Sequence, residues 1–338
     1  MFRLLITRFS AMGDVAMTVP VVHSLASQYP DMRITMLTKK ELKPFFDWMP
    51  ANVEVLGVDL SKYDGMIGLE KLFDELKQRK FDAMADFHDV LRTKYLRSRF
   101  KLSGVKTVKI DKGRDDKKGL LGKGMDTEAL MPTTDRYVET LRKLNLEVTL
   151  DFERAFDPRE EDYAPVFRRV GRKRAGEVWV GVAPFAAHES KIYPLPKMHE
   201  VVQTLANNDV RVFLFGAGEQ EKSLLESWEG PNVMSVCGKL GGLHNEMLLM
   251  SKLDTMLAMD SANMHIAALV GTRVVSVWGA THPKAGFTPW HQPLDNIIQI
   301  ESLSCRPCSV YGDKPCKFGD LRCMNEITPE MILKKLLP

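Results

Sequence analysis

Residues 3–25 read RLLITRFSAMGDVAMTVPVVHSL, a strand, a loop and a helix in direct succession. The apolar run at 3–7 is typical of a β-strand. Valine and leucine residues between positions 15 and 25 then recur close to the 3.6-residue period of an α-helix. The loop that joins them ends in Gly13-Asp14. A strand that passes through a short loop into a helix is the repeating unit of parallel α/β sheets.

The same alternation continues outward along the chain. Helical patterns, one of them at 69–79, separate a first series of strand-like runs at 33–37, 53–58 and 82–86. A charged, proline-containing stretch at 151–174 is typical of an interdomain linker. A second series follows at 177–183, 210–215, 254–259 and 274–278. Strands in such alternation indicate parallel sheets covered on both faces. We therefore predict two Rossmann-like α/β domains, residues 1–160 and 161–326, with parallel sheets facing a central cleft.

The bulk properties are those of a globular chain. A length of 338 residues suits two domains of about 150 to 170 residues each. The net charge of +3 is too small to indicate a nucleic-acid partner by itself. No run approaches the ~20 apolar residues that span a bilayer, and the apolar start is too short for a signal peptide. We therefore expect a cytoplasmic protein.

Ligands of open parallel sheets bind at the carboxyl ends of the strands, so the strand-to-helix loops are the places to search. In the first such loop, Gly13 permits close backbone approach and Asp14 stands at the mouth of a helix. Asp14 is either a helix cap or a carboxylate that takes a proton from an acceptor hydroxyl.

Two loops of the second half carry groups suited to phosphate. Lys191 follows the strand at 177–183 and is either a solvated lysine or part of a phosphate clamp. Asp260, Ser261 and Ala262 follow the strand at 254–259 and lead into a helix that contains His265. The start of this helix is either simply capped, with a satisfied histidine, or it presents backbone amides to a phosphate.

Several familiar motifs do not occur. The turn at 215–219 has only the first two glycines of G-x-G-x-x-G, which argues against a dinucleotide oxidoreductase. The sequence also lacks G-x-x-x-x-G-K-[ST], H-E-x-x-H and G-x-S-x-G.

Taken in order, four motifs resemble a known family. They are Gly13-Asp14, Lys191-x-Tyr193-Pro194, Asp260-Ser261-x3-His265-Ile266-Ala267 and Val277-Trp278-Gly279-Ala280-Thr281. This order is similar to that of the ADP-heptose:lipopolysaccharide heptosyltransferases, glycosyltransferase family 9, and the resemblance covers essentially the whole chain. It implies a GT-B fold and a final helix, residues 327–338, that returns toward the first domain.

The resemblance also implies roles for individual residues. Asp14 would be the general base of an inverting transfer that uses no metal and no cofactor other than the nucleotide-sugar donor. Lys191 would neutralise the diphosphate leaving group, and Glu219 would contact the nucleoside. Asp260, Ser261, Ala262 and His265 would complete the donor site. The acceptor would be a lipopolysaccharide core of the lipid A–Kdo type.

A strongly basic segment occupies residues 92–123, where twelve basic and three acidic residues give a net charge of +9. It is either a solvated surface or a surface that attracts an anionic glycolipid and the inner face of the cytoplasmic membrane. Its glycine-containing part, 113–124, is expected to be a mobile loop. Nucleic acid is disfavoured because no reader motif accompanies the charge. Gly13, Asp86, His88 and Arg92 are the predicted acceptor-side residues.

Four of the five cysteines cluster as Cys305-x2-Cys308-x7-Cys316-x6-Cys323. Their spacing is compatible with structural zinc, with disulfides or with reduced thiols. We expect no catalytic metal.

Other functions remain open alongside heptosyl transfer. The chain could transfer another nucleotide-activated sugar, or it could be a non-catalytic sugar-nucleotide or glycolipid binding module. A nucleotide-sugar epimerase of similar fold is a third alternative, but it would give no reason for the basic segment. Asp14 disfavours a pure binding module, because a binder needs no general base.

Overall fold

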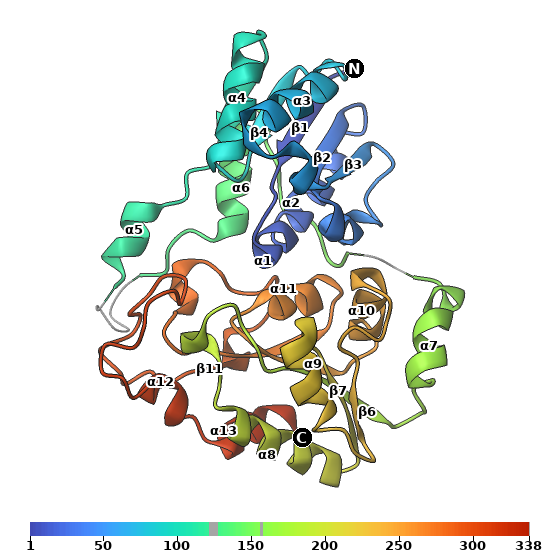
Figure 1. Ribbon diagram of the computed structural model, residues 1–338, viewed down its shortest axis with the longest axis vertical. Helices are drawn as coiled ribbons and strands as arrows, with labels where there is room; N and C mark the ends of the chain where they lie inside the picture. The colour runs from blue at the N-terminus through green and yellow to red at the C-terminus, as the bar shows by residue number, and fades with distance from the viewer. Residues whose placement is uncertain (122–127, 156–157, 338) are drawn as a thin grey trace. The chain divides into compact units, whose positions relative to one another are not determined.

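The computed structural model describes residues 1–121, 128–155 and 158–337, which form two compact units (Figure 1). The first unit contains residues 1–112 and 132–156, and the second contains residues 113–131 and 157–338. Residues 113–131 thus group with the second unit although they lie within the first half of the sequence. The domain boundaries that we predict at residues 160 and 326, and the return of the final helix, stay predictions.

The first unit is built on a five-stranded, wholly parallel sheet in the order β3-β2-β1-β4-β5. Its strands are β1 (Arg3–Thr7), β2 (Arg33–Lys39), β3 (Val53–Val58), β4 (Ala83–Asp86) and β5 (Lys106–Lys109). The central strand β1 is apolar from Leu4 to Ile6, and these side chains are fully buried. A strand covered on both faces requires such a continuous apolar run. The weakly apolar β5 lies inside the basic segment, where the sequence predicted no strand.

Helices and 3₁₀ turns connect these strands. They are α1 (Met12–Ala16), α2 (Val19–Gln28), η1 (Lys40–Phe46), η2 (Leu60–Tyr63), α3 (Gly65–Lys77), α4 (Leu91–Leu102) and α6 (Thr133–Arg142). The single helix predicted from position 15 to 25 is therefore two helices. Pro20 explains the break, because a proline clashes with the carbonyl four residues earlier, and α1 ends at that residue, Ala16.

The second unit contains a six-stranded parallel sheet in the order β11-β10-β9-β6-β7-β8. Its strands are β6 (Val178–Ala183), β7 (Val210–Leu214), β8 (Val233–Ser235), β9 (Thr255–Met259), β10 (Arg273–Val277) and β11 (Ile297–Ile298). The longer helices of this unit are α8 (Leu195–Asn207), α9 (Gly218–Glu226), α10 (Leu243–Met250), α11 (Ala262–Leu269) and α13 (Pro329–Leu336). Short helices are α5 (Arg114–Gly119), α7 (Ala164–Val170), α12 (Arg322–Asn325) and the turns η3 (Glu160–Tyr163), η4 (Glu189–Lys191), η5 (Pro283–Ala285) and η6 (Leu294–Asn296).

Several local expectations can be compared with these elements. The α/β class with parallel sheets is confirmed. Thr328 caps α13, since its hydroxyl accepts a hydrogen bond from the Met331 amide, and α13 packs against α8. The predicted linker at 151–174 contains α7, and the predicted mobile loop contains α5, while residues 122–124 of that loop lie outside the described residues. In the part of the chain that the structure describes, no helix is long and apolar enough to cross a membrane.

Candidate active site

The predicted donor residues lie at one edge of the sheet of the second unit. Strands β9, β6 and β7 are neighbours in this parallel sheet, so their carboxyl ends meet at the same edge. Asp260 directly follows β9, Lys191 lies in the loop after β6, and Glu219 lies in the turn after β7. The topology therefore brings together three loops that are far apart in the sequence.

Lys191 and Asp260 form an ion pair at the centre of this edge. The Lys191 ammonium is 3.3 Å from the Asp260 carboxylate, and both side chains are largely buried. The Thr281 hydroxyl donates a hydrogen bond of 2.7 Å to the same oxygen, Asp260 Oδ2. Because one carboxylate oxygen holds both partners, the ammonium is fixed at the end of β9. Asp260 thus orients Lys191 and would itself repel a bound phosphate.

The start of α11 next to this ion pair offers unused hydrogen-bond donors. Ser261 occupies the N-cap position in an extended conformation, but its side chain does not cap the helix. The Ser261 hydroxyl is buried and, among the described residues, has no hydrogen-bond partner. Ala262 is the first residue of the helix, and His265, one turn later, is buried. A helix start with free amides and a spare hydroxyl suits an anionic oxygen.

Glu219 has a different character from the other predicted donor residues. It stands at the second position of α9, is 91% exposed, and lies 3.7 Å from the Lys222 ammonium. The neighbouring Glu221 accepts a hydrogen bond of 2.7 Å from the Ala217 amide and so stabilises the start of α9. Glu219 is therefore the carboxylate that stays accessible in this turn.

The residues that hold Lys191 were missed by the sequence analysis. Gly312, with φ +82°, lies against the Lys191 stem so closely that a Cβ atom there would be 2.6 Å from Lys191 Cγ. The Ser190 hydroxyl donates a hydrogen bond of 2.7 Å to the Gly312 carbonyl. Ser309 fixes this turn by accepting from the Gly312 amide at 2.8 Å and donating to Asp313 at 2.6 Å. A glycine and a serine within a cysteine-rich stretch, and a serine next to Lys191, gave no signal of this role.

Arg306 organises the segment that carries Thr281. Its guanidinium is 2% exposed and donates to the backbone carbonyls of Gly279, Trp278 and Thr281, and to two further acceptors, Ile300 and Gln299. Burial lowers the pKa of Arg306. A buried guanidinium with only carbonyl and amide partners is costly unless all its donors are used. Arg306 therefore acts as a fixed point for residues 278–281.

The clustered cysteines are thiols in this structure. All of them are free, and in the described residues no three His, Cys, Asp or Glu side chains are arranged to hold a metal ion. Burial raises the pKa of Cys323 to about 11. Backbone N–H groups of 318–321 lower the pKa of Cys316, against the opposing effect of its burial. Cys316 lines a cavity of about 390 Å³ that also borders His188.

In the first unit, Asp14 is held in one orientation by two contacts. It is the third residue of α1, so it is not the N-cap, and its carboxylate accepts a hydrogen bond of 3.1 Å from the Ala11 amide. The same oxygen lies 2.6 Å from the Arg8 guanidinium. The Asp14 side chain remains partly exposed while Arg8 is buried. The carboxylate is therefore both fixed and accessible, as a general base requires.

Arg8 and Tyr137 hold Asp14 in place, Arg8 through the carboxylate and Tyr137 through the backbone carbonyl. Arg8 also donates a hydrogen bond of 2.6 Å to the Phe87 carbonyl. Tyr137 donates one of 3.1 Å to the backbone carbonyl of Asp14 and stacks on the Phe87 ring. Burial raises the pKa of Tyr137, so its hydroxyl remains a donor. Arg8 was not among the predicted site residues, although a charged residue directly after an apolar strand is a signal for this position.

Of the predicted acceptor residues, His88 lies beside the Asp14 loop. The Phe9 amide donates to its Nδ1 at 3.4 Å, and its Nε2 lies 3.3 Å from the Ser10 hydroxyl. Burial, reinforced by the positive charges of Arg8 and Lys112, lowers the pKa of His88 to about 3. His88 is therefore neutral near pH 7.

Asp86 and Arg92 each form an ion pair of their own. Asp86 is fully buried, and its carboxylate accepts from the amides of His88 and Asp89 and pairs with Arg97 at 2.5 Å. It therefore shapes the loop that carries His88. Arg92, at the second position of α4, pairs with Asp64 at 3.0 Å.

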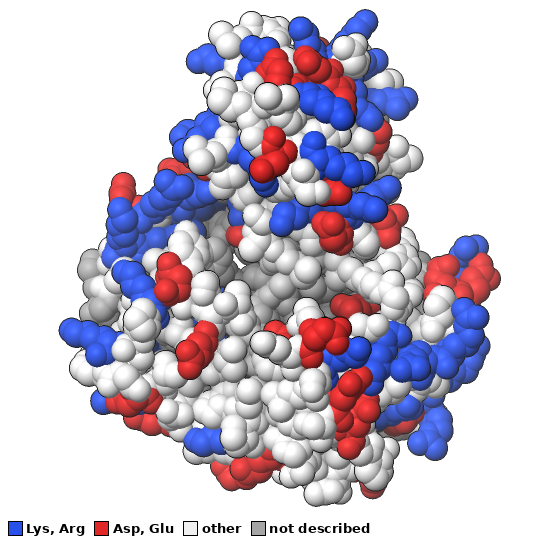
Figure 2. All heavy atoms as spheres, viewed as in Figure 1, with Lys and Arg blue, Asp and Glu red and all other residues white. Residues whose placement is uncertain are grey.

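The basic segment does not form a single surface within one unit. Residues up to Lys112 belong to the first unit and those from Gly113 to the second. Basic side chains gather over α5 and over α7 in the second unit (Figure 2). Many cations of the segment make ion pairs, among them Arg97, Arg99 and Lys109. Lys123 lies outside the described residues.

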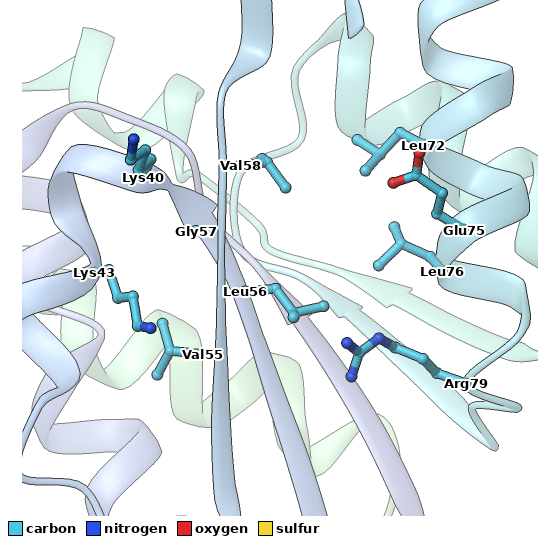
Figure 3. Close-up of a pocket in the computed structure, with 10 residues that line it drawn as sticks. All are labelled: Lys40, Lys43, Val55, Leu56, Gly57, Val58, Leu72, Glu75, Leu76 and Arg79. Atoms are coloured by element: carbon cyan, nitrogen blue, oxygen red, sulfur yellow. The ribbon is translucent and has the colours of Figure 1, made fainter. Parts of the chain in front are cut away.

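A further cavity of about 460 Å³ follows the free edge of β3 between η1 and α3. Figure 3 shows Leu72 and Leu76 from α3 on one side of the strand and Lys40 and Lys43 on the other. None of the predicted site residues lines this cavity, and the candidate active site lies elsewhere.

Comparisons with known proteins agree with this geometry. The model of glycosyltransferase family 9 (heptosyltransferase) matches residues 69–318. Lipopolysaccharide heptosyltransferase 3 of Escherichia coli is 23% identical over 352 residues, covering 96% of each chain. The lipopolysaccharide core heptosyltransferase OpsX of Haemophilus influenzae is 23% identical over 307 residues, covering 88% of this chain and 84% of its own. The solved structure of E. coli ADP-heptose lps heptosyltransferase II is similar with a TM-score of 0.73 at 17% identity, covering 99% of this chain and 97% of its own. The predicted GT-B type of fold, with two parallel-sheet domains, is thereby confirmed.

Proposed function

The chain belongs to glycosyltransferase family 9, and we propose that it transfers a heptose from ADP-heptose to a lipopolysaccharide core acceptor of the lipid A–Kdo type. The observation that carries this proposal is the start of α11. Within the part of the chain that the structure describes, a buried Ser261 hydroxyl without a hydrogen-bond partner and a helix start without a side-chain cap lie beside a lysine that Asp260 holds in place. These are the donors that a diphosphate leaving group needs.

The donor binds to the second unit in this proposal. The amides at the start of α11 and the Ser261 hydroxyl donate to phosphate oxygens, and Lys191 supplies a positive charge. His265, one turn into α11, completes the phosphate site, and Glu219 contacts the nucleoside from the accessible turn after β7. Asp260 acts through Lys191, because a carboxylate in direct contact with a phosphate would weaken binding.

The chemical step is a single displacement. Asp14 accepts the proton of an acceptor hydroxyl while that oxygen forms a bond to the anomeric carbon of the heptose. The bond from this carbon to the phosphate oxygen breaks, and ADP leaves with the bonding electron pair, stabilised by Lys191 and the α11 amides. Base and leaving group act on opposite faces of the sugar, so the configuration inverts. Protein groups neutralise the negative charge of the leaving group, so the proposal assigns no metal.

The acceptor binds near Asp14 in the first unit. Gly13 lets the acceptor approach the backbone, His88 offers a neutral imidazole, and Arg92 offers a cation to an acidic sugar or phosphate. Because the acceptor is an anionic glycolipid, we place the enzyme in the cytoplasm at the inner face of the cytoplasmic membrane. Its partners are then the nucleotide sugar, the glycolipid and the membrane surface.

Mass spectrometry of the purified chain with ADP-heptose tests the proposal, with and without a lipopolysaccharide core that lacks heptose. We expect a core heavier by one heptose. Asp14→Asn should lower turnover by about 10² to 10⁴-fold and leave ADP affinity nearly unchanged. Asp31→Asn, which changes an exposed carboxylate of the same unit, is the matched control and should retain full activity.

The alternatives give other results in the same experiment. ADP-heptose binding without transfer to any core acceptor would favour a binding module. Neither binding nor transfer would exclude heptose and point to another nucleotide sugar. More than a tenth of wild-type turnover in Asp14→Asn would remove Asp14 as the base.

A further inference from the structure

Helix α4 of the first unit has an exposed side that carries both leucine and lysine residues. Its buried side consists of Thr93, Leu96 and Phe100, which pack into the unit. The opposite side carries Leu91, Lys94, Ser98, Lys101 and Leu102, all of them exposed. The spacing of three, four, three and one residues places these five on one helical face. We call them the α4 face.

Both ends of the α4 face are apolar. Leu91 is 85% exposed and Leu102 is 80% exposed, which puts both among the most exposed large apolar side chains of the described residues. Two leucines standing free on one helix face, about 16 Å apart at the helical rise of 1.5 Å per residue, are not explained by packing within the unit. Lys94 and Lys101 lie between them, and neither makes an ion pair in residues 1–121, 128–155 or 158–337.

The start of α3 extends this surface. Ile67 is 89% exposed and Met66 is exposed as well. The ion pair between Arg92 and Asp64 ties the first turn of α4 to the N-cap residue of α3, so Ile67 and Leu91 lie at neighbouring helix starts. Helices α3 and α4 also pack along each other. Together the α4 face, Met66 and Ile67 make up what we call the apolar-basic patch.

One end of the patch is close in the chain to a predicted acceptor residue. Leu91 follows His88 by three residues, and His88 contacts the backbone of Phe9 and the side chain of Ser10 in the Asp14 loop. The helix starts of the first unit lie at the carboxyl edge of its sheet, as does Asp14. A surface that held a lipid there would bring the head group of that lipid close to the base.

We infer that the apolar-basic patch binds an anionic phospholipid bilayer. Exposed leucine and isoleucine side chains enter the interfacial region, and the lysines between them contact lipid phosphates. The charge of Lys94 and Lys101 selects an anionic surface over a neutral one. This inference rests on the proposed function, because it supplies the membrane that presents a glycolipid acceptor to Asp14.

Vesicle sedimentation tests the inference. The full chain should pellet with vesicles of phosphatidylglycerol and phosphatidylethanolamine at low salt, and much less with phosphatidylcholine alone. Each basic residue near such a surface contributes roughly a fivefold factor in partitioning, so Lys94→Gln with Lys101→Gln should lower binding by about 25-fold. Ile67→Ser with Leu91→Ser should lower binding by at least as much.

Leu294→Ser is the matched control, since it also removes an exposed leucine, from the second unit, and it should pellet like the wild type. The inference is overturned if the wild type does not pellet with the anionic vesicles, or if both patch variants pellet as well as the wild type. It is also overturned if the patch variants only dissociate a dimer of the chain, because the patch would then be an interface between copies.

Transfer to a deacylated, water-soluble core acceptor separates this inference from the proposed function. Ile67→Ser with Leu91→Ser should transfer heptose to the soluble acceptor at the wild-type rate and lose activity only on acceptor embedded in vesicles. A wild-type chain that binds anionic vesicles but transfers no heptose to either acceptor would refute the proposed function. The inference that the apolar-basic patch binds a bilayer would then still hold. A patch variant impaired equally on both acceptors would overturn the inference.

Discussion

Gly312 offers a direct test of whether the cysteine-rich stretch holds Lys191 in the position that the proposed transfer needs. In Gly312→Ala, the new methyl group would lie 2.6 and 2.7 Å from Cγ and Cδ of Lys191. Carbon atoms in contact are about 3.5 to 4.0 Å apart, so the Lys191 stem must move by about 1 Å. The ammonium cannot stay at its present place beside Asp260 when the middle of its side chain moves.

The same loop contains a matched control. Gly319 also has a positive φ, +73° compared with +82° at Gly312, but a methyl group at Gly319 would have nothing within 4 Å. An alanine forced into this backbone region costs about 1 to 2 kcal/mol. The backbone strain should therefore cost both variants a similar amount of stability, and only Gly312→Ala should displace Lys191.

A misplacement of about 1 Å in an active site can cost about 10²-fold in rate. We expect Gly312→Ala to lower kcat/KM for the nucleotide sugar by about that factor and to weaken ADP binding in calorimetry. Gly319→Ala should keep both values within about twofold. Combining Gly312→Ala with Lys191→Ala gives the decisive comparison, because once the lysine is absent the added methyl should have little further effect on activity.

Equal activity in the two alanine variants would refute the role of Gly312. So would a double variant in which Gly312→Ala still lowers activity 10²-fold after Lys191 is removed. In that case the loop would act on the reaction by a route other than the lysine stem.

Three further changes test other parts of the site. Arg8→Gln removes the guanidinium that fixes Asp14, so kcat should fall by about tenfold or more with ADP affinity unchanged; unaltered kcat in a steady-state assay would contradict this. His88 has a folded-state pKa of about 3, below its unfolded value, so its contribution to stability is fully present above about pH 6.5 and is lost as pH falls toward 3. Between pH 6 and pH 4, the free energy of unfolding obtained from thermal melts should therefore fall by about 2 kcal/mol more for the wild type than for His88→Gln. Parallel curves of stability against pH for the two proteins would count against the buried neutral imidazole. Arg306→Met leaves the carbonyls of 278–281 without their donor, so the free energy of unfolding should fall by about 3 kcal/mol, and the melting temperature by roughly 10 °C; a melting temperature within a few degrees of the wild type would show that water replaces the guanidinium.

The regular parts of the fold could be predicted because local sequence and burial agree there. Strands such as β1 and β9 are covered on both faces, and each contains a continuous apolar run of three or four residues. The elements that were missed lack this agreement. β5 reads KTVK, with two lysines in four residues, and β11 contains only two residues. Their pairing with a neighbouring strand, and not their own composition, makes them strands.

The candidate site likewise contains residues that the sequence indicates and residues whose role depends on their contacts. Lys191, Asp260 and Asp14 could be proposed as site residues from the sequence because each directly follows a strand, or the loop from one, where parallel sheets place their ligands. Asp86 meets the same positional rule, yet it is fully buried and bonded to the amides of His88 and Asp89. Position after a strand therefore predicts that a side chain is near the site, and only its partners decide whether it contacts a ligand or shapes the loop.

The supporting residues were beyond sequence analysis for a physical reason. Gly312 holds Lys191 across a separation of more than a hundred residues, by the contact of a backbone with an aliphatic stem. Such a contact uses no side-chain chemistry of its own, so no residue type marks it. Arg306 leaves a trace in the sequence, but an arginine surrounded by cysteines points to a metal or redox role before it points to backbone carbonyls. In the proposed donor site, Gly312 holds the Lys191 stem and Arg306 holds the segment that carries Thr281. A site transplanted by its predicted residues alone would therefore have the proposed groups and lack the contacts that keep them in place.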